Sequence, residues 1–375
     1  MEAYLILKVV WWLLLGVLLM GLAIMVGMDM GVGTILRYVG RTDTERRVAL
    51  NIVGPHWEGN QVWFILGGGA IFAAWPALYA ASFSGFYLAM FAILAALIFR
   101  PLAIVYRSKL ANLRWRAWWD WVLFATGLIP SIIFGVAFGN LFLGVPFGFD
   151  ADLRFHSEIS LLGLLRPFPL LVGLTSLAMI ALHGATWLSL KADGAVAQRA
   201  RTFIPFLAAA FIVLFIADGV WLRALDGFSV AAGLVHDGPS NPLLKTVVTA
   251  GGGWFANYHA NPLLWIAPIL ALAGALTATL LRSRPLIAFI GSALTAATTI
   301  ATAGLALFPF LLPSSSQPNA SLTVWDASSS KLTLMIMLAA TAIFLPLIVL
   351  YTSWVFRVMR GPVRAEDIAN DHGAY

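Results

Sequence analysis

Three charged side chains in an otherwise apolar sequence could carry protons. Asp29 ends the first long apolar segment, Glu58 begins the second, and Arg100 ends the third. An ionisable side chain inside a membrane costs about 2.5–3.5 kcal/mol on insertion scales and usually has a function. A carboxylate binds and releases one proton, and a nearby arginine changes its pKa. We interpret the three residues as an entrance for protons or cations, and a paired ion cluster at the membrane boundary is the alternative.

Glu58 stands in the sequence Trp57-Glu58-Gly59-Asn60. Its glycine and asparagine neighbours leave room for water beside the carboxylate, which a proton relay requires. We therefore select Trp57, Gly59 and Asn60 as residues that support this site.

Two further ionisable residues lie inside predicted membrane helices. His183 follows Met179 by one helical turn, and either side chain can be an axial haem ligand. Both lie on one helix face and cannot hold a haem from opposite sides, so a hydrogen-bonded core histidine is favoured. Asp218 is close to Arg223 in the sequence, which favours a place at the membrane interface. Because the chain also has no cysteine, the sequence predicts no catalytic, haem-binding or metal-binding residue.

The elements that position these residues are membrane helices. Hydrophobic residues make up 61% of the 375 residues and charged residues 11%, against about 25% charged in a soluble domain. Residues 59–99 and 285–325 are two runs of 41 without a charge, and about 20 apolar residues cross a bilayer. This composition excludes a soluble globular protein, a disordered protein and a nucleic-acid-binding domain. We predict one all-α, polytopic membrane domain over residues 1–375.

Charges, proline and glycine breaks, and tryptophan positions divide the chain into nine predicted membrane helices. The long run 59–99 contains two of them, with a break near Ala80–Phe83. The nine helices are expected at about 5–28, 61–79, 83–105, 121–143, 167–190, 203–222, 262–281, 286–310 and 332–356.

The distribution of lysine and arginine between the loops predicts the orientation. Seventeen of these residues fall on one side of the nine-helix arrangement and six on the other. Because positive residues accumulate in cytoplasmic loops, we expect the N-terminus outside and the C-terminus in the cytoplasm. The same asymmetry explains the net charge of +6 without any nucleic-acid partner.

Long motifs along the whole chain resemble subunit II of cytochrome bd-type quinol oxidases. They include GPHWEGNQVW at 54–63, GGGAIFAAWP at 67–76, YAASFSGFY at 79–87, FRP at 99–101, YRSK at 106–109, GVAFGN at 135–140, GVPF at 144–147, SNPL at 240–243, FPFLLPSS at 308–315 and ASLTVWDASS at 320–329.

The resemblance implies two four-helix bundles plus a ninth helix, paired with a larger subunit I in the bacterial cytoplasmic (inner) membrane. It implies that subunit I carries two b-type haems and the d-type haem, and that the complex oxidises quinol and reduces oxygen to water. This chain would stabilise subunit I and supply cytoplasmic protons, so that turnover builds proton motive force. Small accessory subunits, membrane lipid and a structural quinone in this chain are further partners that the resemblance allows.

The resemblance also assigns residues by motif. Glu58 and Arg100 match the family's route for cytoplasmic protons toward the haems of the partner. The first membrane helix of the family carries Asp-Gly-Phe-Asp, where this chain has Val26-Gly27-Met28-Asp29. The first acid is missing, so a role for this pair rests on Asp29 alone and Glu58 is the stronger candidate.

Two other classes of function remain open from the sequence. An ion-coupled secondary transporter would use Asp29 and Glu58 for coupling, although such proteins often contain inverted repeats and none is readable here. A purely structural membrane subunit would use the acids as salt-bridge partners.

Overall fold

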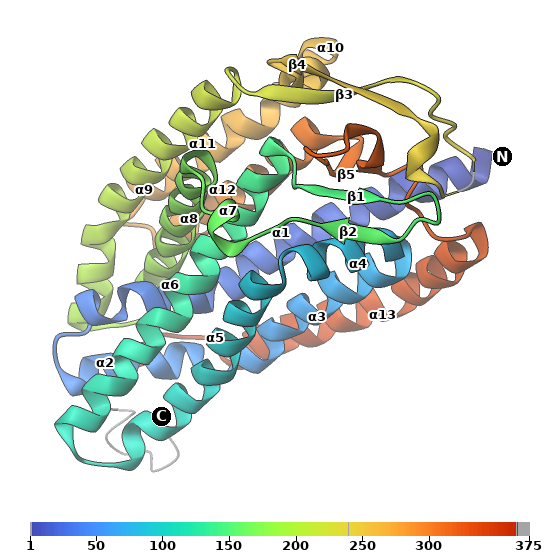
Figure 1. Ribbon diagram of the computed structural model, residues 1–375. Coiled ribbons are helices and arrows are strands. Elements are labelled where there is room, and N and C mark those ends of the chain that lie inside the picture. The colour runs from blue at the N-terminus through green and yellow to red at the C-terminus, as the bar shows by residue number, and fades with distance from the viewer. Residues whose placement is uncertain (1, 239, 365, 367–375) are drawn as a thin grey trace.

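The computed structural model describes residues 2–238, 240–364 and 366. Long helices lie side by side, and α1 (Glu2–Val39) runs along most of the molecule (Figure 1). The other helices are α2 (Asp43–Val53), α3 (Trp57–Ala74), α4 (Pro76–Gly85), α5 (Tyr87–Tyr106), α6 (Leu113–Leu143), α7 (Leu161–Leu164), α8 (Pro167–Lys191), α9 (Gly194–Leu222), α10 (Ala256–Ala260), α11 (Ile266–Leu280), α12 (Pro285–Leu307) and α13 (Lys331–Val358). Short 3-10 turns are η1 (Arg107–Lys109), η2 (Pro242–Leu244), η3 (Gly253–Phe255), η4 (Pro262–Trp265) and η5 (Pro318–Ala320).

Eight helical segments within the described residues are long and apolar enough to cross a membrane. They are α1, α5 with η1, α6, α8, α9, α11 with η4, α12 and α13. The segment predicted at 61–79 is not among them. It corresponds to α3, which has 18 residues and carries Glu58, Asn60 and Gln61 near its start. Length and composition therefore support eight membrane helices, and the predicted count of nine is not established.

The break predicted near Ala80–Phe83 lies instead at Trp75. Trp75 adopts φ −138° and ψ 75°, because a proline disfavours the helical conformation for the residue before it. Pro76 then begins α4 as a separate short helix, and a second break at Phe86 separates α4 from α5.

The first helix is much longer than the predicted segment 5–28. Its 38 residues correspond to about 57 Å at a rise of 1.5 Å per residue. Because the helix continues from Asp29 to Val39, Asp29 lies about three turns before its end. The sequence had suggested that Asp29 lies at the end of the first helix. In the structure it lies inside that helix.

Glycines allow the central helices to approach closely. A Cβ atom on Gly31 of α1 would lie 2.1 Å from the backbone oxygen of Ile180 in α8. A Cβ on Gly135 of α6 would lie 2.4 Å from the backbone oxygen of Val172, also in α8. Inside a membrane, helices associate through close packing and not through the hydrophobic effect. Small residues such as glycine allow the two backbones to come close enough for this packing. The helices α1, α6 and α8 thus form the centre of the molecule.

Three small antiparallel sheets lie at the end of the molecule that holds the N-terminus (Figure 1). They pair β1 (Phe147–Phe149) with β2 (Phe155–Ser157), β3 (Asp226–Ala232) with β4 (Thr246–Gly251), and β5 (Phe310–Leu312) with β6 (Leu322–Thr323). The chain is mostly helical, as the all-α prediction required, and these short hairpins lie in the loops between the long helices. Their backbone groups are partly buried and need hydrogen-bond partners, which the hairpins supply.

The opposite end gathers basic segments that the sequence placed on one side of the membrane. Arg46 of α2 and Arg107 of η1 both contact Asp120 of α6, at 2.7 and 2.6 Å. Lys191 Nζ at the end of α8 donates to the backbone oxygen of Met359, at 2.6 Å. The segments after α1, α5 and α8 and the segment after α13 therefore lie together, as the charge count predicted.

Candidate functional site

Asp29 is buried between helices, and only one of its two carboxylate oxygens has a hydrogen-bond partner among the described residues. Its side chain is on α1 and is 4% exposed. Asn60 Nδ2 of α3 donates a hydrogen bond to Asp29 Oδ2 at 3.0 Å. Asp29 Oδ1 has no hydrogen-bond partner among the described residues. A buried acceptor of this kind is costly unless water or another group reaches it.

Arg100 shares a small cavity with Asp29. The arginine is 3% exposed, and its Nη2 donates to the backbone oxygen of Thr126 in α6, at 2.5 Å. The cavity has a volume of about 20 Å³ and is also lined by Leu50 and Val53 of α2. This volume suffices for one water, which needs roughly 10–15 Å³. The surface exposed inside it is apolar, so the cavity lies beside the acid and the arginine without opening their polar atoms to it.

Glu58 does not join this pair. It is exposed and makes no hydrogen bond or ion pair with the described part of the chain. Residues two positions apart on an α-helix are separated by about 200° around its axis. Glu58 and Asn60 therefore lie on opposite faces of α3. The predicted meeting of three charges is therefore wrong in one respect. Asp29 and Arg100 come together, and Asn60 takes the place expected for Glu58.

The supporting residues play different parts. Asn60 is 2% exposed and binds the acid directly. Trp57 is partly buried against the main hydrophobic core. Gly59 is exposed, and a Cβ atom there would meet nothing within 4 Å. Of the three, only Asn60 contacts a charged residue of the site.

His56, which the sequence analysis did not select, is buried just before α3. It is 7% exposed, and neither ring nitrogen has a partner among the described residues. Its ring lies against Trp187 and Phe356, with centroids at 5.8 and 5.2 Å. Burial, together with the positive charge of Lys191, lowers the pKa of His56 to about 4. The imidazole is therefore neutral near pH 7.

His183 is a hydrogen-bonded core residue, as its sequence context favoured. Its Nδ1 lies 2.8 Å from Ser292 Oγ of α12, and its Nε2 lies 3.1 Å from the backbone oxygen of Ile24 in α1. The ring stacks on Phe289 with centroids 4.9 Å apart. Both nitrogens are engaged, so the side chain joins three helices and does not fit an axial haem ligand.

Asp218, about one turn before the end of α9, lines a cavity. Thr175 Oγ1 of α8 donates to Asp218 Oδ2 at 2.5 Å. The same carboxylate lines an apolar cavity of about 620 Å³ between the helices. The sequence could not reveal this cavity, because residues from most of the long helices form it.

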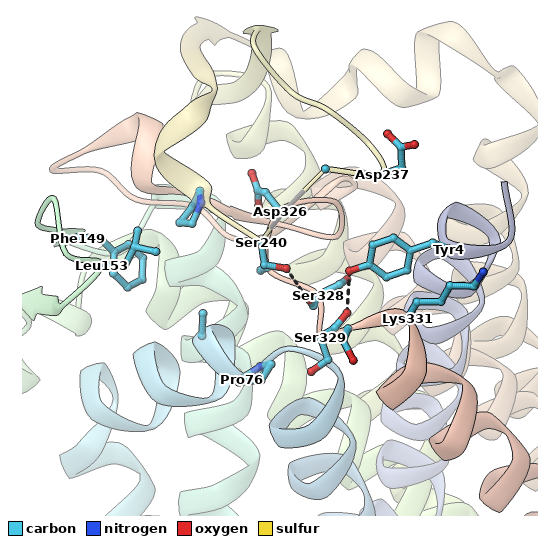
Figure 2. A pocket seen from close by; sticks show the side chains of 15 residues that line it. Tyr4, Pro76, Phe149, Leu153, Asp237, Ser240, Asp326, Ser328, Ser329 and Lys331 are labelled. Carbon is cyan, nitrogen blue, oxygen red and sulfur yellow. Dashed lines mark hydrogen bonds between the residues drawn. The ribbon is translucent and has the colours of Figure 1, made fainter. Parts of the chain in front are cut away.

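A second cavity, of about 660 Å³, opens at the end that carries the hairpins (Figure 2). Tyr4 Oη donates to the backbone oxygen of Ser329 at 2.8 Å. Lys245 Nζ lies 2.7 Å from Asp326 Oδ2 and also donates to the backbone oxygen of Ser321 at 2.5 Å. Burial lowers the pKa of Lys245, and the charge of Asp326 opposes that change. These contacts of Tyr4, Lys245 and Asp326 hold the loops beside the cavity in place.

No group of three or more metal-binding side chains occurs in the described part of the chain. What remains is a buried carboxylate beside an arginine, a water-sized cavity and an exposed acid on the adjacent helix. Together with eight membrane-spanning candidates in the described part of the chain, these features define a multi-pass membrane protein with a buried acid and arginine near each other between its helices.

Comparison with known proteins identifies the family. The family model described as cytochrome bd terminal oxidase subunit II matches residues 7–359. The chain therefore belongs to the cytochrome bd terminal oxidase subunit II family, and it is a multi-pass protein of the bacterial inner membrane.

Relatives match over nearly the whole length. Cytochrome bd-I ubiquinol oxidase subunit 2 of Escherichia coli strain K12 is 47% identical over 99% of both chains. A probable cytochrome oxidase subunit 2 of Haemophilus influenzae is 46% identical, also over 99% of both. The solved structure of bd oxidase from Geobacillus thermodenitrificans contains a chain with the same fold, with a TM-score of 0.68, at 16% identity over 94% of this chain and 98% of that one.

Proposed function

We propose that this chain is the subunit of a quinol:oxygen oxidoreductase that stabilises a haem-bearing subunit I and supplies it with cytoplasmic protons. The observation that supports the proposal is the buried carboxylate of Asp29, which lies near Arg100 and has one oxygen without a hydrogen-bond partner among the described residues. Oxygen reduction consumes protons, and a buried acid can store and transfer them. The reaction itself belongs to the partner, and this chain contributes no catalytic residue.

The proposed route begins at the end that gathers the basic segments. The small cavity is bordered there by Leu50 and Val53 of α2, and it reaches Asp29 deeper in α1. Asn60 connects Asp29 to the first turn of α3, and Glu58 lies in that same turn on the outer face. A proton would pass from Asp29 to Glu58 through water and leave the chain at the surface of α3.

Glu58 marks the proposed contact with subunit I. A charged side chain facing hydrocarbon costs a few kcal/mol, so an exposed acid on a membrane helix requires a covering partner. The last helix, α13, lies beside α3, and of its residues only Leu334 is buried. A larger subunit seated on α3 and α13 would cover both the acid and this apolar helix. Small accessory subunits and lipid would occupy other faces.

We also propose that α3 is a ninth membrane helix. Its first turn contacts Asp29 at Asn60, and its last residue, Ala74, accepts a hydrogen bond from the backbone of Ser329 at 2.8 Å. Ser329 in turn binds Tyr4 near the start of α1. The helix α3 therefore runs antiparallel to α1 for most of its length. Nine crossings would put the two termini on opposite sides of the membrane, and the basic loops favour a cytoplasmic C-terminus. The same count allows two four-helix bundles plus α13.

The cofactors are assigned between the two subunits. Membership of this family implies haem in the complex. We place two b-type haems and the d-type haem in subunit I, because His183 of this chain uses both of its nitrogens in hydrogen bonds. A structural quinone, if this chain holds one, would occupy the apolar cavity of about 620 Å³.

The decisive variant is Glu58→Gln in the complete complex. It keeps the shape of the side chain and removes its titration. We expect quinol-driven oxygen consumption to fall about tenfold or more, in line with the loss of a proton-transfer group, while haem spectra and the yield of complex stay normal. Glu58→Asp, which keeps a titratable carboxyl at the same position, is the matched control and should retain most of the activity. Full activity of Glu58→Gln would favour a purely structural role for the acids.

The transporter alternative is tested on the same preparation. A reduced-minus-oxidised spectrum of the protein purified from its native membrane should show haem together with a larger partner. Purification without haem would favour transport.

A further inference from the structure

The proposed proton route leaves one buried ionisable residue of α8 unused. His183 is 0% exposed, and it contacts Ser292 and Phe289 of α12 and the backbone of α1. An ionisable side chain inside a membrane helix usually has a function. Because both ring nitrogens of His183 are engaged within the chain, that function follows from the groups that it contacts.

The hydrogen bonds define the tautomer of His183. A backbone carbonyl only accepts, so Nε2 carries the proton that it donates to the oxygen of Ile24. Nδ1 then accepts from Ser292 Oγ in the neutral ring. His183, Ser292 and Thr186 are at most 1% exposed, and no carboxylate of the described residues forms a hydrogen bond or ion pair with them. Burial without a counter-charge favours the neutral imidazole.

The imidazole ring is held by α8 and α12 on the side away from α1. Thr186, one turn after His183 on α8, donates to the backbone oxygen of His183 at 2.8 Å, and its Oγ1 also lies 2.6 Å from Ser292 Oγ. The ring stacks on Phe289 with centroids 4.9 Å apart. These contacts fix the orientation of the ring, so that its Nε2–H is directed at one carbonyl of α1.

The face of α1 that meets His183 offers no large side chain. Gly27 and Gly31 share this face with Ile24, because positions three and seven residues apart lie within about 60° around the helix axis. A Cβ atom on Gly27 would lie 3.7 Å from His183 Cδ2, and one on Gly184 of α8 would lie 2.2 Å from the backbone carbon of Gly31. Glycines let the backbones touch but have no side chain that interlocks. The hydrogen bond to the carbonyl of Ile24 therefore adds a directional restraint on the rotation of α1.

Asp29 lies on the opposite face of the same helix. It follows Gly27 by two residues, which is about 200° around the axis, and it is about 7.5 Å along the axis from Ile24. On that face its carboxylate accepts the hydrogen bond from Asn60 at 3.0 Å and lies near Arg100. A rotation of α1 that released the carbonyl from the histidine would also turn the carboxylate away from these two partners.

We propose that His183 is a positioning residue for proton supply: it restrains the rotation of α1 and so holds the carboxylate of Asp29 toward Asn60 and Arg100. The proposal rests on the proposed function, in which Asp29 supplies protons. It assigns no proton transfer to His183 itself. It requires only one donor toward Ile24 and one acceptor toward Ser292. A glutamine side chain carries both groups at a spacing similar to that of the two imidazole nitrogens, and leucine carries neither.

The experiment compares variants of the intact two-subunit complex. His183→Leu removes both hydrogen bonds, and His183→Gln restores them. Ser292→Ala is a milder second variant, because it keeps the histidine and removes the partner of Nδ1. Thr298→Val is the control, since it removes a hydroxyl of α12 that bonds to the backbone of its own helix. Each variant is also made in an Asp29→Asn background.

Two quantities are measured on each complex. The first is the initial rate of quinol-driven oxygen consumption per haem. The second is the infrared spectrum of each protein minus the spectrum of its own Asp29→Asn derivative. This difference isolates the carboxyl band of Asp29 in either protonation state, and the position of the band reports the hydrogen bonds that the carboxyl group makes.

We expect His183→Leu to lower the rate about fivefold or more, because a small misplacement of a reacting group slows its reaction. The same variant should shift the Asp29 band, and Ser292→Ala should shift it less. His183→Gln should resemble wild type in both measurements, and Thr298→Val should change neither. In the Asp29→Asn background, His183→Leu should add little to the loss of rate, whereas independent effects would multiply.

An unshifted Asp29 band in His183→Leu, or a band in His183→Gln that matches the one in His183→Leu, would overturn the inference. If His183→Leu does not assemble, an unshifted band in Ser292→Ala does the same. A histidine with a merely structural role would lower the yield or the Tm of the complex and leave the band in place. Asp29→Asn alone tests the proposed function. Full activity of that variant would refute proton supply by Asp29, while a shifted band in His183→Leu would still show that the histidine positions it.

Discussion

Asp29 accepts a hydrogen bond from Asn60 at 3.0 Å and keeps its second carboxylate oxygen without a partner. This contact joins α1 to α3 at the depth of Arg100. It also turns the exposed Glu58, two residues earlier on α3, toward the outside of the chain.

Replacing Asp29 by Asn should separate proton transfer from packing. The variant keeps the size of the side chain and removes the proton, so we expect oxygen consumption to fall about tenfold or more while assembly is retained. Asn60→Ala removes the hydrogen bond and leaves the acid, so it should cost about 1 kcal/mol of stability and much less activity. Initial rates with an oxygen electrode, normalised to haem content, distinguish the two. Equal losses in both variants would argue for a structural site.

Adding one methyl group at Gly31 should disrupt the centre of the molecule. Its Cβ would lie 2.1 Å from the backbone oxygen of Ile180, and backbone cannot move aside cheaply. We expect Gly31→Ala to lower the stability of the complex by about 1–3 kcal/mol or more. Gly16→Ala on the same helix meets nothing within 4 Å and should be neutral or slightly stabilising. Thermal unfolding followed by haem absorbance measures both, and similar Tm values would contradict the packing argument.

Lys245→Met should loosen the loops that carry the hairpins. The substitution leaves the carboxylate of Asp326 buried without its cation, which typically costs about 3–5 kcal/mol. The double variant Lys245→Met with Asp326→Asn removes that uncompensated charge and should recover part of the loss. Limited proteolysis within residues 226–251 is the readout. A single variant as resistant as wild type would show that the ion pair is dispensable.

His56 should make the end of the molecule that gathers the basic segments sensitive to acid. Its pKa is about 4 in the folded chain because of burial and the charge of Lys191, against an ordinary value of 6.5. A depressed histidine pKa favours folding above pH 6.5, and this stability, at most about 3 kcal/mol, is lost as the pH falls from 6.5 toward 4. His56→Phe should flatten this part of the pH profile. Hydrogen exchange of the segment 51–60 at pH 7 and pH 5 tests it, and an unchanged pH dependence in the variant would be inconsistent with this account.

Much of the candidate site could be predicted from the sequence, but not its geometry. Asp29 and Arg100 were selected because ionisable residues are rare in apolar segments, and they do share a cavity. Glu58 was expected beside them because it begins the next helix. Its direction depends on how α3 packs on α1, which the position of a residue along the chain does not reveal. His56 was missed because both of its aromatic neighbours are more than a hundred residues away in the chain.

The sequence by itself determined the class of this protein, its family and the grouping of its basic loops at one end. These properties follow from composition, local motifs and the charges between apolar segments, and none of them requires knowing which helices touch. The tertiary structure alone decided which acid is buried, which acid faces outward, and that Asp218 lines a cavity. Such properties arise where side chains from distant helices converge, because the direction of a side chain around its helix and the choice of its neighbour are set by packing.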